Sequence, residues 1–365
     1  MADGGGERSE DRIARLRLIR TPGIGPVTYQ QLLARFGSPA AALDAVPELA
    51  RRGGGRPPAI TPRAAIEREI AAVMAAGARY LFRGLGLYPR LLAESEGAPP
   101  VLIVKGETAL LDRPAVALVG ARNASGAAVR FARMLASGLA ERGIVVVSGL
   151  ARGIDTAAHQ GAIGGGTIAV VAGGVDVVYP PENEALQREI GERGLILAEQ
   201  PPGTEPRARH FPYRNRIIAG LAAGTVVVEA APKSGSLITA RYAAEFGREV
   251  MAVPGSPLDA RAQGCNLLIR EGATLVQTVD DIVEAVSDIG GGLATPAAGY
   301  AAPPPADAGD AERRTVTTLL GPVPLPVDEL VRQTGLPPAI VQTVLLELEL
   351  AGRLERHAGG RVSLA

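Results

Sequence analysis

The stretch AVALVGARNASGAA, residues 115–128, decides the fold of this chain. It passes from a continuous apolar run into a glycine turn, and then into a helical segment that the hydroxyl of Ser125 can cap. Short apolar runs followed by helices are typical of parallel strands that are covered on both faces. Such sheets bind ligands in the loops beyond the carboxyl ends of their strands. Residues 120–126 therefore form the first loop of interest.

The same alternation extends in both directions along the chain. Further strands are predicted at residues 101–105, 144–148, 167–171, 195–198, 225–229 and 249–253. Helices are predicted at residues 124–140, 154–163, 182–190, 214–221 and 236–246. Together these segments predict an α/β domain over residues 78–288, built on a Rossmann-like, doubly wound parallel sheet.

A small all-α domain is predicted before the sheet, over residues 11–77. Two of its helices are joined by Gly23-Ile24-Gly25, an arrangement similar to the helix-hairpin-helix (SAM-like) domain of DNA-associated proteins. The two glycines let the backbone approach a phosphate, and the following helix offers free amide groups. Gly23 and Gly25 are therefore possible additional phosphate contacts. A plain pair of antiparallel helices is the alternative interpretation.

The chain ends are expected to differ from the sheet domain. Residues 1–10 are polar and Gly-rich and predict disorder, whereas residues 289–310 are mostly Gly, Ala and Pro and predict a linker. Residues 311–365 predict three helices and a hairpin, the pattern of a C-terminal winged helix. Its presumed DNA-reading helix, 338–351, contains two glutamates and no Lys or Arg. Because such a helix fits a phosphate-lined groove poorly, we predict a protein-contact or oligomer-tuning domain.

Composition excludes several classes of protein. The 38 basic and 38 acidic residues cancel, which argues against a generally cationic surface but allows local patches. Aromatic residues make up 3% of the chain and Trp is absent, which argues against a base-stacking platform. The single cysteine, Cys265, rules out an internal disulfide and fits a reducing compartment. With no secretion signal and no membrane-length apolar run in the sequence, we expect a soluble, cytoplasmic protein.

The predicted loops at the carboxyl edge of the sheet gather cations, hydroxyls and glycines. Lys233 is notable because it is one of only two lysines in the chain, the other being Lys105. Cations, backbone amides and hydroxyls together suit a ligand that carries phosphates. The candidate contacts are Arg122, Ser125, Ser148, Gly149, Arg152, Arg207, Arg209, Arg214, Asn215, Arg216, Lys233, Ser234, Gly235 and Ser236.

No catalytic residue, cofactor or metal site is predicted. Arg122 stands where a dinucleotide-binding loop has its second glycine, and the next predicted strand ends without an acid. There is no Walker-type phosphate loop, and the histidines and the cysteine lack the spacing of metal ligands. Asp155 and His159 could transfer a proton, but no nucleophile accompanies them, so we favour a structural role for both.

Several of these motifs resemble the DNA-processing protein A (DprA/Smf) family of bacteria. The resemblance covers about residues 80–285, and Ala121 departs from it because that position is often threonine in the family. It implies a single-stranded DNA-binding protein of natural transformation that protects incoming strands, helps to load the recombinase RecA and forms a homodimer through the Rossmann-like domain. It assigns strand contacts to Arg122, Ser148, Gly149, Arg214, Asn215, Lys233, Ser234 and Gly235. The motifs are VGAR, SGLARGID, YP, FPYRNR, KSGSL and VPG.

Two other functions fit the same loops. The sheet and its Gly-rich turns are similar to those of lysine-decarboxylase-like phosphoribohydrolases, in which Glu229 could serve as the base. A nucleotide-sensing protein with a Rossmann-like fold is the other alternative. Release of a free base from a nucleotide would favour the first, and binding of a mononucleotide but not of an oligonucleotide would favour the second.

Overall fold

The computed structural model describes residues 9–291, 306–357 and 359–365. The chain divides into two compact units, one of residues 69–296 and the other of the residues up to Arg68 together with those from Ala297 onward. Predictions for residues 1–8 and for the linker positions 292–305 lie outside the described residues. Within the described ranges, no helix is both long and apolar enough to cross a lipid bilayer.

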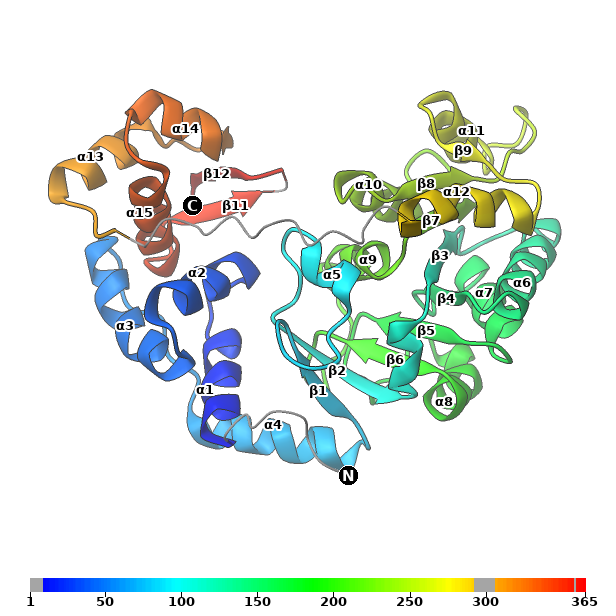
Figure 1. Cartoon of the computed structure of the whole chain (residues 1–365), viewed down its shortest axis with the longest axis horizontal. Helices are drawn as coiled ribbons and strands as arrows, with labels where there is room; N and C mark the ends of the chain where they lie inside the picture. Colours follow the sequence, from blue (N-terminus) through cyan, green and yellow to red (C-terminus); the bar gives the residue numbers. More distant parts are fainter. Residues whose placement is uncertain (1–8, 292–305, 358) are drawn as a thin grey trace. The chain divides into compact units, whose positions relative to one another are not determined.

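The central unit, residues 69–296, is built on a mixed sheet (Figure 1). In the part of the chain that is described, nine strands follow the order β1-β2-β6-β5-β4-β3-β7-β8-β9. Strands β3 to β9 run parallel, which confirms the predicted Rossmann-like sheet, while β2 pairs antiparallel with β6 and with β1. Their bounds are β1 Arg79–Phe82, β2 Val101–Gly106, β3 Ala115–Gly120, β4 Val145–Ser148, β5 Thr167–Val171, β6 Leu195–Ala198, β7 Gly224–Val228, β8 Glu249–Ala252 and β9 Thr274–Leu275.

Helices cover both faces of this sheet because the central strands are apolar on both sides. One face packs against α6, α7, α8 and α12, and the other against α5, α9, α10 and α11 (Figure 1). The side chain of Ser125 accepts a hydrogen bond from the amide of Ala128 and so caps α6, as predicted. The bounds are α5 Arg90–Glu94, α6 Gly126–Glu141, α7 Ile154–Ala162, α8 Glu184–Arg193, α9 His210–Leu221, α10 Ser236–Glu245, α11 Gln263–Arg270 and α12 Val279–Gly291, with short 3-10 turns η1 Thr108–Asp112 and η2 Pro181–Asn183.

The order of the strands reverses between β3 and β7. From β3 the chain builds the sheet outward through β4, β5 and β6, and it then returns to add β7, β8 and β9 on the other side. The helices that follow β3 and β7 therefore lie on opposite faces of the sheet, and the loops that lead to them are joined through Glu229. Two non-glycine residues with positive φ, Leu150 at 54° and Glu229 at 59°, lie in loops at this edge.

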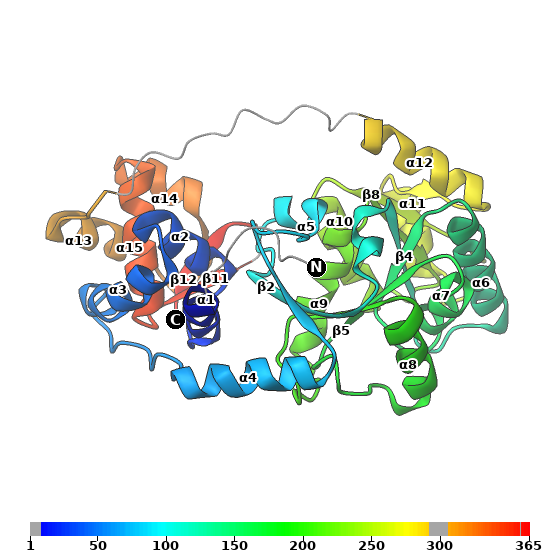
Figure 2. The same cartoon turned by 60° about the horizontal axis from the view of Figure 1, so that its bottom comes forward.

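The second unit joins the two ends of the chain and contains the predicted helix-hairpin-helix and winged-helix folds (Figure 2). The exposed Gly23 has a φ of 82°, which lets the chain turn before Gly25 precedes the helix α2. Its elements are α1 Ser9–Arg20, α2 Pro26–Phe36, α3 Pro39–Arg52, α13 Asp310–Leu319, β10 Leu325–Pro326, α14 Val327–Thr334, α15 Pro338–Leu350, β11 Leu354–His357 and β12 Arg361–Leu364, and the helix α4 Arg63–Ala75 leads into the central unit.

Candidate nucleic-acid interface

The loop after β3 presents an arginine on an aromatic support. Arg122 is exposed at its tip, and its guanidinium carbon lies 5.1 Å from the centre of the Phe211 ring. The Phe211 ring in turn lies 5.7 Å from that of Tyr179. Among the described residues, no carboxylate lies within ion-pair distance of Arg122, so its charge stays available to a ligand. The aromatic ring holds the cation in place without neutralising it.

The far end of this loop is fixed by Glu229 at the end of β7. Its carboxylate accepts a hydrogen bond of 2.7 Å from the amide of Ser125, and its carbonyl accepts one from Ala121. Arg261, in the loop after β8, reaches the same carboxylate at 3.8 Å. Glu229 is therefore an anchor between three loops.

The loop after β4 lies over a buried charged cluster. Asp155 accepts hydrogen bonds from the amides of Gly149 at 3.1 Å and Ala151 at 3.4 Å, and it faces the guanidinium of Arg214 at 3.9 Å. Arg214 is only 6% exposed, and a Cβ at position 149 would overlap its guanidinium. The glycine is thus required by the close approach of Arg214. The cluster gives the loop a single rigid shape.

His159 supports the same loop from below. Its Nε2 accepts the amide hydrogen of Leu150 at 3.2 Å, and its Nδ1 lies 2.7 Å from the hydroxyl of Thr167. Since Nε2 acts as an acceptor, the imidazole is neutral. This contact and the bond from Asn183 to the Leu150 carbonyl hold Leu150 in its left-handed conformation.

Burial controls the ionisation of this cluster. Desolvation, with a smaller contribution from the neighbouring charge of Arg214, lowers the pKa of His159 to about 3. Desolvation also raises the pKa of Asp155, although Arg214 and two backbone amides oppose that change. The pKa of Arg214 falls to about 10, first through burial, with Asp155 opposing the shift. Arg214 therefore remains charged at neutral pH beside a buried carboxylate.

Replacing His159 with glutamine should reduce the loss of stability on acidification. In the wild-type chain His159 is neutral when folded, with a pKa of about 3, and titrates near 6.5 when unfolded. On acidification the unfolded state therefore takes up the proton before the folded state does. The titration of His159 leaves the free energy of unfolding unchanged above pH 6.5 and lowers it as the pH falls toward 3. At pH 5 the loss is about 2 kcal/mol.

Urea denaturation of the wild type and of His159→Gln between pH 5 and 7.5 measures this difference. Asp155 is present in both chains, so its opposite titration cancels in the comparison. Equal pH dependence in the two chains would contradict the prediction.

The loop before α9 carries two further exposed cations, Arg207 and Arg209. Within the described ranges neither has a carboxylate at ion-pair distance. His210 beneath them is 8% exposed, and its Nδ1 accepts the amide hydrogen of Arg207 at 3.3 Å. Burial lowers the pKa of His210, and the charges of Arg209 and Arg207 lower it further. A lowered histidine pKa agrees with a locally positive surface.

The loop after β7 presents Lys233 on a rigid turn. Lys233 is exposed, and in the described chain no carboxylate pairs with it. The side-chain amide of Asn215 donates to the carbonyl of Gly235 at 3.2 Å, and the hydroxyls of Ser234 and Ser236 lie 2.8 Å apart. This turn leads directly into α10, and the amides of Leu237 and Ile238 bond back to the carbonyls of Ser234 and Gly235.

The structure places several of the predicted contact residues beneath the loop surface. Ser148 is fully buried and donates its hydroxyl hydrogen to the carbonyl of Leu118 at 2.6 Å. Arg216 is 8% exposed and binds both oxygens of Glu199, at 2.6 and 2.7 Å. Together with Asn215 and the buried Arg214, these side chains support the loops from beneath. The sequence motifs that contain these residues do not show which side chains hold the loops in place and which contact a ligand.

The remaining predicted residues have mixed positions. Arg152 is exposed but lies 3.6 Å from Glu182, which is equally exposed. Gly23 and Gly25 belong to the other unit. Sequence reasoning missed Arg261, which is 45% exposed and pairs with Asp259 at 2.8 Å. The sequence did contain a signal for Arg261, because the loop that carries it follows a predicted strand and therefore lies at the same edge of the sheet as the other loops.

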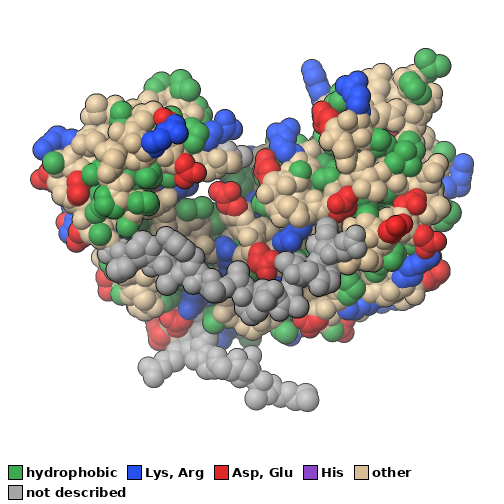
Figure 3. Space-filling model, turned by 45° about the horizontal axis from the view of Figure 1, so that its top comes forward, with side chains coloured by type: hydrophobic (Ala, Val, Ile, Leu, Met, Phe, Trp, Pro, Cys, Tyr) green, Lys and Arg blue, Asp and Glu red, His purple; other side chains and the backbone are tan. Residues whose placement is uncertain are grey.

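The cations form local groups rather than one basic patch. Figure 3 shows separate Lys and Arg side chains on the surface of the central unit, among hydrophobic, uncharged and acidic side chains. In the described ranges, no group of three or more His, Cys, Asp or Glu side chains is arranged to hold a metal ion. The arrangement can bind an anionic polymer along several loop tips.

Comparison with known families gives three matches along the chain. Residues 79–287 match the family DNA recombination-mediator protein A. Residues 9–72 match the DprA-like N-terminal HHH domain, and residues 300–360 match the DprA winged helix domain.

Curated relatives share these regions. The chain is 50% identical over 198 residues to the DNA processing protein DprA of Streptococcus pneumoniae, covering 54% of this chain and 70% of that protein. It is 38% identical over 284 residues to the protein Smf of Escherichia coli, covering 76% and 75%. The match to the protein Smf of Synechocystis, 43% identical, covers 55% of this chain and only 52% of that relative.

Two solved structures are similar. The X-ray structure of DprA from Streptococcus pneumoniae has a TM-score of 0.62 and 36% identity, covering 76% of this chain and 98% of that one. A DprA structure from Helicobacter pylori, which concerns a single-stranded DNA binding mode, has a TM-score of 0.53 and 29% identity. It covers 58% of this chain and 97% of that one.

Proposed function

Because the chain belongs to the family of DNA recombination-mediator protein A, we propose that its exposed loop tips bind single-stranded DNA by the sugar-phosphate backbone. One observation carries the proposal. Arg122, Arg207, Arg209 and Lys233 lie exposed in loops at one edge of the sheet, and among the described residues none is neutralised by a carboxylate. Backbone contacts of this kind do not depend on base sequence. The Helicobacter pylori relative, whose structure concerns single-stranded DNA, supports the choice of ligand.

The proposal divides the residues into two groups. The exposed cations, with the backbone of the turn at Ser234 and Gly235, contact the strand. The buried residues Asp155, Arg214 and Arg216 hold the loops in position and do not reach it. Preformed loops lose little conformational freedom on binding, so more of the contact energy remains as affinity.

The wider role follows from the family. We include in the proposal a function in natural transformation, protection of the incoming strand, loading of RecA, and pairing of two chains through the central unit. Light scattering of the purified chain measures the pairing directly. Residence in the cytoplasm stays a prediction.

Binding without bond cleavage is also part of the proposal. Glu229, the residue that a phosphoribohydrolase would need as a base, is held by the amide of Ser125 and by Arg261. A carboxylate engaged in this way is a poor general base. Incubation with AMP and a search for released adenine tests this point.

Affinity for an oligonucleotide should fall steeply with salt. Each phosphate contact to a single strand contributes about −0.7 to the slope of log K against log salt, so four contacts give roughly −3. Fluorescence anisotropy with labelled poly-dT of about 20 nucleotides, from 50 to 300 mM NaCl, measures the slope. Lys233→Ala should make the slope less steep by about 0.7.

Lys105 provides a matched control because it is the other lysine of the chain. It pairs with Ile196 near the start of β6, at the opposite edge of the sheet. Lys105→Ala should therefore leave both slope and affinity unchanged. A slope near zero, or equal effects of the two lysine substitutions, would contradict the proposed site. Tight binding of a mononucleotide but not of the oligonucleotide would favour a nucleotide sensor.

A further inference from the structure

The two ends of the chain share one hydrophobic core. Leu346 and Leu350 of α15, in the winged helix, are each 2% exposed and pack with the helices of the N-terminal domain. Their neighbours there include Val46, Leu49 and Ala50 of α3, all 3% exposed or less. Burial on this scale is typical of a domain interior rather than of a transient contact.

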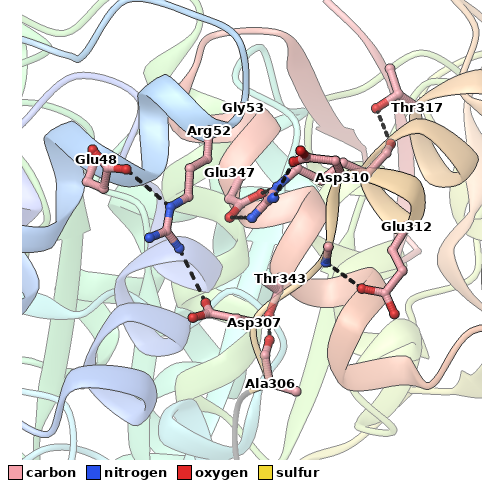
Figure 4. A network of polar contacts seen from close by, with 12 residues as sticks. Glu48, Arg52, Gly53, Ala306, Asp307, Asp310, Glu312, Thr317, Thr343 and Glu347 are labelled. Carbon is pink, nitrogen blue, oxygen red and sulfur yellow. Dashed lines mark hydrogen bonds and ion pairs between the residues drawn. The ribbon is translucent and has the colours of Figure 1, made fainter.

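Polar contacts surround this core. Gln31 of α2 donates to Gln342 of α15 at 2.8 Å, and Arg35 donates to Thr343 at 3.1 Å. Asp307 binds Arg35 and also Arg52, the latter at 3.4 Å. Figure 4 shows Arg52 reaching between Glu48 of its own helix and Asp307. Apart from the pair within α3, these bonds join residues that are separated by most of the chain.

Two glycines mark how closely the helices approach. A Cβ at Gly53 would overlap the carbonyl group of Glu347, and a Cβ at Gly55 would overlap Ala351. Gly53 has a φ of −70°, a conformation that any residue can adopt. Its lack of a side chain is therefore required by α15 and not by its own backbone. The carbonyl of Gly53 also accepts a hydrogen bond from Arg353 at 3.0 Å.

The acidic residues of α15 are used inside the unit. Glu347 is fully buried and binds Arg313 through two hydrogen bonds, of 2.8 and 3.0 Å. Glu349 binds Arg356 of β11 at 2.8 Å. A helix that is covered by another domain and contains no cation cannot enter a DNA groove in this arrangement.

We propose that α15 is a protein-recognition helix whose partner is the N-terminal helical domain of the same chain. The two terminal domains then act as one module with a common core, and the winged helix reads neither bases nor phosphates through α15. This inference is independent of strand binding by the central unit. It concerns a surface that the proposed function does not use.

Chemical cross-linking of the full-length chain tests the partner. Gln31→Cys combined with Gln342→Cys places two thiols where the amides now touch, and the native Cys265 is buried. A short bismaleimide should join the two positions within one chain, at a yield that does not change on tenfold dilution. Either single substitution serves as the control. Failure to cross-link, or cross-links only between two copies, overturns the proposal.

Hydrogen exchange provides a second, independent measurement. Gly53→Ala should accelerate amide exchange in both α3 and α15 by at least tenfold, because the added methyl group separates the helices. Gly321→Ala is the matched control, since a Cβ there meets nothing within 4 Å. Unchanged amide exchange in α15 of the Gly53→Ala variant overturns the proposal. The alanine would then act only within α3, by stabilising the end of that helix.

Discussion

Replacing Asp155 with alanine is expected to lower the free energy of unfolding of the central unit by about 3 to 5 kcal/mol. The substitution leaves the buried guanidinium of Arg214 without its counter-charge. It also removes the acceptor for the amides of Gly149 and Ala151. A buried charge without a partner is costly because neither water nor another group solvates it. The loop that covers Arg214 should lose its fixed shape at the same time.

Urea denaturation followed by circular dichroism measures this loss. The matched control is Glu182→Ala, which removes the carboxylate from the exposed pair with Arg152 and should change stability by less than about 1 kcal/mol. Similar effects of the two substitutions would show that the Asp155 and Arg214 pair contributes no more than a surface contact. A large loss only for Asp155→Ala would agree with the proposed supporting role.

The double substitution of Arg122 and Lys233 by alanine is expected to weaken binding of a single-stranded oligonucleotide by about 100-fold or more. The two side chains lie in loops that follow the adjacent strands β3 and β7, so both lie at the edge of the sheet where the strand order switches. Both are exposed, so folding should be unaffected. Removing both charges eliminates two charge-assisted phosphate contacts while Asp155 and Arg214 of the buried cluster, which feel the charge of Arg122, keep their own pairing.

Anisotropy titration at a fixed salt concentration measures the loss, and thermal unfolding checks that the fold is intact. Lys105→Ala is the control for a general loss of positive charge. An affinity within twofold of the wild type would mean that the strand follows a different path. The residues Arg207 and Arg209 would then be the next pair to replace.

The alternation of strands and helices made most of the fold predictable. Each strand predicted from an apolar run is present, because fully buried parallel strands need apolar residues on both faces. The antiparallel direction of β2 was not predictable, since an apolar run has no direction. Strands β1 and β9 were also missed, the latter because it consists of only Thr274 and Leu275. Helix α11 was missed because it follows a loop without a clear start signal.

The site was predictable at the level of loops but not of single side chains. Arg214 and Arg216 were expected to face the ligand with Arg122. Their burial depends on Asp155 and Glu199, which lie on other elements. Charge patterns in a sequence show which residues are present but not which of them meet. The strand contacts therefore stay a proposal.

The charge pattern of the winged helix predicted the kind of partner of α15 but not its identity. Glu347 and Glu349, without a cation on the same helix, indicated contact with protein rather than DNA. Both acids bind arginines of their own domain, and the face of α15 beside them meets α3. The identity of that partner was beyond sequence reasoning, because the contacting residues are far apart in the chain.

The shared core of α3 and α15 affects how the protein is made. The ribosome completes Leu49 about 300 residues before it reaches Leu346. At about 5 to 20 residues per second, the apolar side of α3 waits roughly 15 to 60 s for its partner. The central unit emerges and can fold during this interval. The helical domain that contains α3 therefore emerges before the central unit but is completed after it, and its exposed apolar side is a target for chaperones during translation.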